Sequence, residues 1–430
     1  MATKLLVVQV AALGWDLVKD IPGFHAAEAF FPAVTCTAQA GFRTASLPRE
    51  HGMVANGVRL ADLRKILFWE QSSALVHGER IWSRYRAAGR KVGMMFWQQS
   101  LGDEELDLVL SPAPIHKHSG GMIQDCYAKP EGLSERLSKV LRRPFNLMHY
   151  WGPLASRKSS AWITDATCAL LRDEQFAPDL LFSYIPHLDY DLQRHGPDSR
   201  RARKSVDFTL ECIARIKSEA EARGYHWLFY GDYAIQPVSS AVFPNQRLRE
   251  AGLLETRWIR KMVYADHFAS PAFAMVDHQI AHVYTRDARA TAAARSALEG
   301  LPGIERILDR KEQALLSLDH PRSGDLLLIA QAGQWFAYPW WTKKELTPDF
   351  ASHVDIHNKP GYDPCELFFG WPPPSVSMDT RRVRGSHGRP GDKVAWNSSL
   401  NFAVPPESML DIARFTKAWL DSQSGQSGSL

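Results

Sequence analysis

Short apolar runs alternate with segments of helical periodicity along most of this chain. Residues 4–10, 91–98, 179–185 and 227–230 are such runs, rich in Val, Leu, Met and aromatic residues. Residues 205–223, between the last two, place apolar side chains on one helical face. Runs this short and this apolar are typical of strands buried on both sides. The pattern predicts an α/β fold, with a mainly parallel central sheet flanked by helices.

The chain is expected to form a single α/β domain over residues 1–421, with inserted loops and a small cap region. Pro- and Gly-rich stretches make residues 100–160 and 325–400 the candidates for that cap and those loops. Within the second stretch, apolar runs on either side of Gly333 predict an antiparallel pair of strands. Residues 422–430 are rich in Ser, Gly and Gln, and we expect a flexible tail there.

Composition excludes several classes of partner. A net charge of +4 over 430 residues is too small for a nucleic-acid-binding protein. No apolar run approaches the ~18–20 residues of a membrane span. Five scattered cysteines without paired spacing suggest neither disulfides nor a cysteine zinc site. We therefore expect a cytoplasmic protein with a small-molecule substrate, and the sequence leaves the oligomeric state open.

Thr35 lies where a helix is expected to begin, after the turn formed by Phe31 and Pro32. Free N–H groups and a positive dipole at such an end could activate a hydroxyl towards phosphorus. Thr is also a preferred N-cap, so this residue alone does not decide between the two roles. Asn56 follows in an Asn-Gly turn, and its amide could donate to an anionic oxygen.

Acidic and imidazole side chains gather after two of the predicted strands. Asp189, Asp191 and His195 follow the strand at 179–185, and Asp232 with Tyr233 follows the strand at 227–230. Aspartate and histidine are common zinc ligands. A polar loop that caps a helix would give the same pattern, so metal binding remains one of two readings.

Further histidines occur later in the chain. His278 and His282 lie in a strand-like stretch where alternation would put both on one face, although a buried core histidine is the more usual outcome. His357 precedes Gly361 and Tyr362. His387 lies in a Gly-rich basic loop and could contact an anion or a substrate.

Taken in order, these segments resemble the type I phosphodiesterase/nucleotide pyrophosphatase family of the alkaline phosphatase superfamily. The Phe31-Pro32-x-x-Thr35 segment matches the start of the family's nucleophile helix, and Pro48 through Asn56 matches its next segment. The resemblance implies that Thr35 is the nucleophile and that Asn56 donates to a phosphate oxygen. It also implies a divalent metal cofactor, namely one or two zinc ions, held by Asp189, His195, Asp232 and His357.

The chain departs from the family at three metal positions. Ala11 or Ala12 stands where the first strand should end in a metal-binding Asp, and Tyr233 replaces a His. Counting back from Gly196 places Gln193 at another His position. A shift of one or two residues would bring in His195 instead, with Asp191 as its carboxylate partner.

Two hypotheses follow. The first is a metal-assisted hydrolase of a phosphate ester, phosphodiester or pyrophosphate bond, acting on a nucleotide-like or other small phosphoester through Thr35. The alternative is an inactive binding or scaffold protein that keeps the fold. Some of the aromatic residues near the expected site are expected to form a stacking wall for a flat or apolar group. The candidates are Tyr190, Tyr233, Tyr362, Trp335, Trp340 and Trp341.

Overall fold

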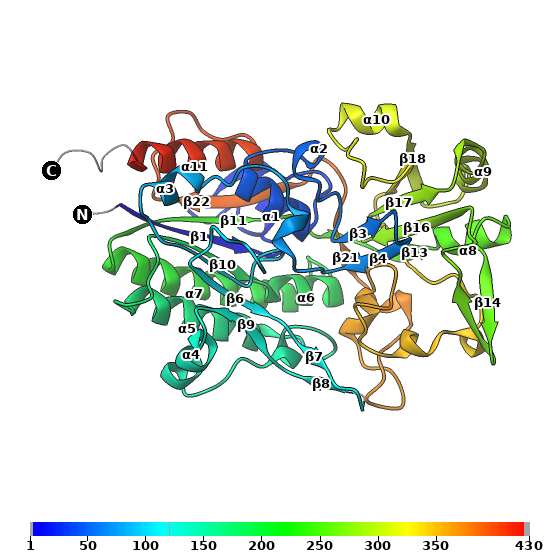
Figure 1. The fold of residues 1–430 in the computed structure, drawn as a ribbon, viewed down its shortest axis with the longest axis horizontal. Coiled ribbons are helices and arrows are strands. Elements are labelled where there is room, and N and C mark those ends of the chain that lie inside the picture. The colour runs from blue at the N-terminus through cyan, green and yellow to red at the C-terminus, as the bar shows by residue number, and fades with distance from the viewer. Residues whose placement is uncertain (1–2, 120, 425–430) are drawn as a thin grey trace.

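A computed structural model describes residues 3–119 and 121–424 of the chain. Its main feature is an eight-stranded sheet, which lies beside a smaller four-stranded sheet (Figure 1). The large sheet has, from one edge to the other, the order β2 (His25–Glu28), β22 (Lys393–Ser398), β11 (Tyr225–Gly231), β1 (Lys4–Val10), β10 (Leu180–Ile185), β5 (Val92–Met95), β6 (Leu108–Pro112) and β9 (Cys126–Lys129).

Parallel pairing joins the five central strands, and the edge strands are antiparallel. Strand β1 pairs in parallel with β10 on one side and β11 on the other, so Val8 lies opposite both Ser183 and Phe229. Every residue of β10 is buried, as expected for a strand covered on both faces. The α/β fold predicted from the sequence is therefore confirmed.

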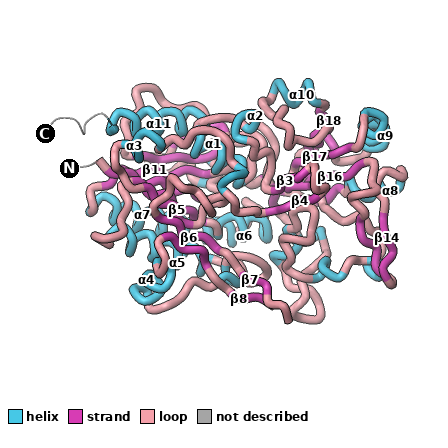
Figure 2. The backbone as a smooth tube through the Cα atoms, viewed as in Figure 1, coloured by secondary structure: helices cyan, strands magenta, loops and turns pink. Residues whose placement is uncertain are grey.

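Helices cover both faces of the large sheet (Figures 1 and 2). One layer consists of α1 (Thr35–Thr44), α3 (Ser83–Ala87) and α11 (Met409–Ser424). The other consists of α4 (Leu133–Leu141), α5 (Arg157–Arg172), α6 (His187–His195) and α7 (Arg200–Ala222). Within the second layer, α5 packs on β10 and α7 on β11.

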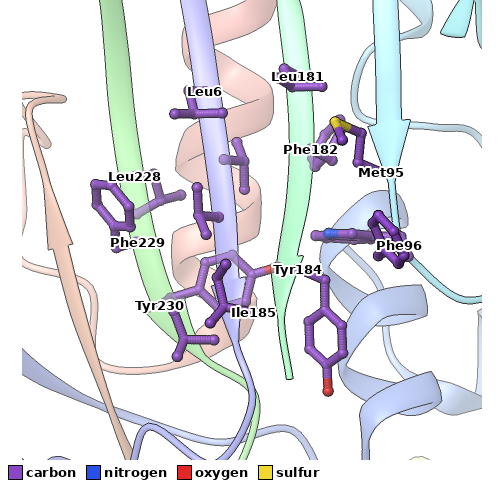
Figure 3. Close-up of a cluster of buried hydrophobic side chains, with 14 of the residues drawn as sticks. Leu6, Met95, Phe96, Leu181, Phe182, Tyr184, Ile185, Leu228, Phe229 and Tyr230 are labelled. Carbon is purple, nitrogen blue, oxygen red and sulfur yellow. The ribbon is translucent and has the colours of Figure 1, made fainter. Parts of the chain in front are cut away.

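Aromatic side chains fill the core between the sheet and the α1 layer. The ring of Phe182, in β10, contacts Phe42, Trp82 and Trp97 at centroid distances of 6.3, 5.1 and 5.0 Å. Figure 3 shows Phe182 among the apolar side chains of the neighbouring strands, with Tyr184 nearer the end of β10. Much of the aromatic content thus stabilises the fold by apolar burial.

The second sheet is antiparallel and has its own apolar core. Its order is β16 (Ala272–Asp277), β17 (Ile280–Thr285), β19 (Leu326–Ala330) and β18 (Ile304–Leu308). Nearby helices are α8 (Pro244–Glu250), α9 (Ala288–Leu298) and α10 (Arg310–Leu315). The antiparallel pair predicted around Gly333 is wrong: β20 (Gln334–Phe336) turns away and pairs in parallel with β13 (Ser240–Val242).

Short elements make up most of the remaining structure. They are α2 (Pro48–His51) and the pairs β3 (Gly57–Leu60) with β4 (Lys65–Phe68), β7 (Ile115–His116) with β8 (Met122–Ile123), β12 (Gln236–Pro237) with β21 (Gly385–Ser386), and β14 (Thr256–Ile259) with β15 (Met262–Ala265). Helix α11 continues to Ser424, which corrects the start of the predicted tail; residues 425–430 lie outside the described residues. Within residues 3–119 and 121–424, every helix is too short or too polar to cross a bilayer.

We expect Phe182→Ala to lower the free energy of unfolding by about 3–5 kcal/mol, because it opens a cavity among three aromatic rings. Urea denaturation followed by far-UV circular dichroism measures the loss. Trp371→Ala is the matched control, since that side chain is 83% exposed and its loss should change stability by less than about 0.5 kcal/mol. Equal losses in the two variants would contradict the described core.

Candidate active site

The candidate site lies at the edge of the sheet where the parallel strands end. Val10 of β1 is in register with Ile185 of β10 and Gly231 of β11. The segments that follow these three strands therefore emerge side by side, and Asp232 is the first residue after β11. Ligands of α/β sheets bind at this edge.

A cavity of about 100 Å³ lies at this edge. Side chains from several distant segments line it, among them Thr35, Tyr184, Asp189, Tyr233, His278 and Tyr362. Rings of Trp69, Tyr150, Trp151 and Tyr190 also face it. Of the residues predicted for a stacking wall, Tyr190, Tyr233 and Tyr362 do line this cavity.

Thr35 is the first residue of α1 and lies on the cavity wall. Asn56 caps the same helix end: its Oδ1 accepts the N–H of Cys36 at 2.9 Å. Its Nδ2 donates to Asp277 Oδ1 at 3.1 Å, and its own backbone N–H donates to Asp277 Oδ2 at 2.7 Å. Asn56 thus connects the start of α1 to the end of β16. One Nδ2 hydrogen of Asn56 bonds to Asp277, so only the second Nδ2 hydrogen could donate to a phosphate oxygen as predicted.

Tyr233 occupies the centre of the cluster. Its hydroxyl donates to Asp189 Oδ1 at 3.0 Å. Its ring stacks on His387 at a centroid distance of 3.5 Å and an interplanar angle of 4°. Burial, followed by the charges of Asp189 and Asp232, raises the pKa of Tyr233 well above its usual value, and a hydrogen bond with Thr35 opposes the rise. The phenol therefore stays protonated beside the Thr35 hydroxyl.

Gln193 holds the other oxygen of Asp189. Its Nε2 donates to Asp189 Oδ2 at 2.7 Å, and its Oε1 accepts the hydroxyl of Tyr362 at 3.0 Å. Tyr362 in turn stacks on His278 at 3.7 Å. Burial raises the pKa of Asp189, whereas His278 and the two hydrogen bonds lower it. Both oxygens of Asp189 thus receive a hydrogen bond from a neutral side chain.

Asp232 is completely buried and holds the ends of β1 and β11 together. Its Oδ1 accepts the N–H groups of Ala12 and of Tyr233, each at 3.0 Å. Gln9 Nε2 donates to its Oδ2 at 2.9 Å, and Tyr230 donates to Gln9 Oε1 at 3.1 Å. Burial raises the pKa of Asp232 to about 8 despite these hydrogen bonds, so the group retains a proton at neutral pH.

His387 is the histidine that approaches Asp189. Its Nδ1 donates to the carbonyl oxygen of Ala33 at 2.7 Å, which leaves Nε2 as an acceptor 3.9 Å from Asp189 Oδ1. Nε2 is buried and has no hydrogen-bond partner among the residues that the structure describes. Burial holds the pKa of His387 well below its usual value, so the ring is neutral.

The remaining predicted residues lie elsewhere. His195 lies against Arg201, with 3.3 Å between Nε2 and Nη1, and His357 is exposed with its ring 5.3 Å from that of His116. Asp191 accepts a hydrogen bond from Ser205. The structure therefore does not place these three predicted residues with Asp189 and Asp232.

His278 and His282 do not share a strand face as alternation would predict. His278 has a φ of +60° and forms the turn between β16 and β17, where its Nδ1 lies 2.7 Å from Asp277 Oδ1. His282 is a buried core histidine whose Nε2 donates to the carbonyl oxygen of Val54 at 3.1 Å. Only His278 faces the cavity.

The side chains at this site do not fit the zinc centre implied by the sequence. Among the described residues, no three His, Cys, Asp or Glu side chains are arranged to hold a metal ion. Asp189 and His387 are the two potential metal ligands that approach each other here, and Tyr233 contacts both of them. Two ligands are fewer than the three that catalytic zinc sites use.

Sequence reasoning missed an ion cluster at the cavity wall. Lys359 is 2% exposed, and its Nζ lies 2.8 Å from Asp363 and 2.6 Å from Glu366. Burial raises the pKa of Glu366 to about 7, although Lys359 opposes the rise. The spacing of these three residues is that of an ordinary polar loop, so the sequence carries no signal for the cluster.

Asp232→Asn tests the protonated state of this buried carboxyl. The folded pKa of about 8 exceeds the ordinary 3.8, so the folded state binds the proton more tightly and the wild type loses stability as pH rises between these values. Near neutral pH the loss is on the order of 1 kcal/mol per pH unit. We expect the Asn variant to fold. Its free energy of unfolding, measured by urea titration, should change less between pH 5 and pH 8 than that of the wild type. A wild-type stability that rises over this range would contradict the assignment.

Solved structures of known proteins share this fold. Phosphonoacetate hydrolase from Sinorhizobium meliloti 1021 superimposes with a TM-score of 0.63 at 16% identity, covering 97% of this chain and 96% of that one. Murine ectonucleotide pyrophosphatase/phosphodiesterase 5 gives a TM-score of 0.58 at 12% identity over 97% and 95% of the two chains. The human counterpart gives 0.57 at 13% identity, again over 97% and 95%.

The sequence itself supports a family assignment. Among curated proteins, none matches this sequence. The profile of the family described as type I phosphodiesterase / nucleotide pyrophosphatase, however, matches residues 16–363. This span contains Thr35, Asp189, Gln193, Asp232 and Tyr233 and covers most of the chain. The protein therefore belongs to the type I phosphodiesterase/nucleotide pyrophosphatase family, within the alkaline phosphatase superfamily.

Proposed function

We propose that the chain hydrolyses an ester of phosphorus and that Thr35 is its nucleophile. The observation that carries this proposal is the position of Thr35 at the first residue of α1, on the wall of a cavity at the carboxyl edge of the sheet. The family assignment supports the reaction class.

Two related structures support the ligand class. The hydrolase from Sinorhizobium meliloti has been solved with phosphonoacetate and with phosphonoformate. Murine ectonucleotide pyrophosphatase/phosphodiesterase 5 has been solved as an inactive threonine-to-alanine variant in complex with AMP. For the present chain we propose a small phosphoester or phosphonate whose tetrahedral group meets the start of α1.

The geometry supports a two-step displacement. The Thr35 oxygen forms a bond to phosphorus as the bond to the leaving oxygen breaks, and that oxygen departs with the electron pair and takes up the proton that Thr35 loses. The positive end of the α1 dipole faces the charge that develops on the phosphoryl oxygens, while the N–H of Cys36 is bonded to Asn56. Water then attacks phosphorus, the bond from phosphorus to Thr35 breaks, and the Thr35 oxygen takes up the proton that the water loses.

Aromatic rings would hold the rest of the substrate. Trp69, Trp151 and Tyr190 face the cavity and suit a flat or apolar group attached to the ester. Tyr362 and Asp363 also line a second cavity of about 930 Å³, which Trp335 and Trp341 line as well. A longer substrate could extend from the first cavity into the second.

The metal cofactor predicted from the sequence would activate the hydroxyl and hold the phosphoryl oxygens. Because Tyr233 and Gln193 occupy both oxygens of Asp189, we assign no step to a metal. The same observation favours a second candidate function, namely a protein that binds the phosphoester without cleaving it.

Thr35→Ala is the direct test of the nucleophile. We expect the rate on an aryl phosphodiester to fall by about 10³-fold or more, because the bond-forming oxygen is removed. Thr35→Ser should retain measurable turnover. Acid-quenched wild-type samples should contain a phosphorylated peptide that spans Thr35, detected by mass spectrometry.

Thr44→Ala is the matched control, because it makes the same substitution at the other end of α1, where the hydroxyl donates to the carbonyl oxygen of Ala40 and lies 2.7 Å from Ser46 Oγ. Full turnover by Thr35→Ala would refute the nucleophile. A wild-type protein that binds aryl phosphoesters but cleaves none of a broad panel would favour the second candidate.

A further inference from the structure

Neutral side chains occupy the space around Asp189 that a cation would need. Tyr233 donates to one oxygen at 3.0 Å and Gln193 to the other at 2.7 Å. Hydrogen atoms of an O–H and an N–H group therefore point at the carboxylate from within the cluster. A metal ion bound to either oxygen would face these hydrogens at close range.

Tyr233 also separates Thr35 from Asp189. Its hydroxyl is hydrogen-bonded to Asp189, and the Thr35 side chain lies near enough to the same phenol to lower its pKa. Its ring lies flat against His387, so a rotation away from the cluster would break a stacked contact at 3.5 Å. The phenol is thus fixed where an ion joining Thr35 to Asp189 would lie.

Hydrogen-bond donors also reach both oxygens of Asp232. Three N–H groups reach its two oxygens, from Ala12, from Tyr233 and from the Gln9 side chain, at 2.9–3.0 Å. All three donors belong to β1, β11 or the turns that follow them, and Asp232 is completely buried. This carboxyl serves the junction of the two strands and faces no open space.

We propose that this centre works without a metal ion, with Tyr233 and Gln193 in place of metal-binding histidines. This inference does not rest on the proposed function.

Zinc binding tests whether the centre works without a metal ion. The full-length wild type, dialysed against zinc and then against buffer, should retain far less than one zinc per chain by atomic emission, and zinc should not raise its Tm. The Gln193→His/Tyr233→Phe variant replaces the amide by an imidazole beside Asp189 and His387 and removes the phenolic donor. We expect it to retain about one zinc per chain and to gain thermal stability with zinc.

Gln423→His, near the end of α11, is the control for an added histidine away from the cavity. One zinc retained per wild-type chain would overturn the metal-free centre. Zinc binding by neither the wild type nor the double variant would overturn the role given to Gln193 and Tyr233, provided that circular dichroism shows a folded variant. Neither result depends on turnover, so the nucleophile test remains separate.

Discussion

The position of β1 between β10 and β11 determines where every group of the candidate site lies. Parallel pairing on both sides brings the ends of three strands to one edge, although β1 lies more than a hundred residues before the other two in the sequence. Asp232 then connects two of these ends through the N–H of Ala12 and the amide of Gln9. The same edge receives the start of α1 and the first turn of α6, which bring Thr35 and Asp189 to one cavity.

Within this framework, uncharged hydrogen-bond donors surround Asp189 at the positions where a metal centre would have a cation. A buried carboxylate is costly unless it is paired or hydrogen-bonded. Here Asp189 is satisfied by a phenol and an amide, and Asp232 retains its proton. The cluster is therefore held together by hydrogen bonds from uncharged donors, and its chemistry depends on the Thr35 hydroxyl and on helix α1.

Much of this could be predicted from local sequence. Buried strands can be predicted because they are short and apolar. The order of the segments around Thr35, Asp189 and Asp232 indicated both the fold and the family. Position counting offered Gln193 as an alternative to His195, and in the structure Gln193 contacts Asp189. The sequence did not indicate that His387 approaches Asp189 and that His357 does not. The chain makes a long irregular excursion between these two histidines and returns through β21, where pairing with β12 brings His387 against Tyr233. That route depends on tertiary packing, which no local pattern shows.

The central claim is that a phenol, and no metal ion, lies between Thr35 and Asp189. A crystal structure grown with excess zinc, with diffraction data collected on both sides of the zinc absorption edge, measures this directly. The account predicts no anomalous peak beside Asp189 or His387, and a Tyr233 hydroxyl within hydrogen-bonding distance of Asp189. An anomalous peak bound by Asp189 and His387, with Tyr233 displaced from its stacked position, would contradict it.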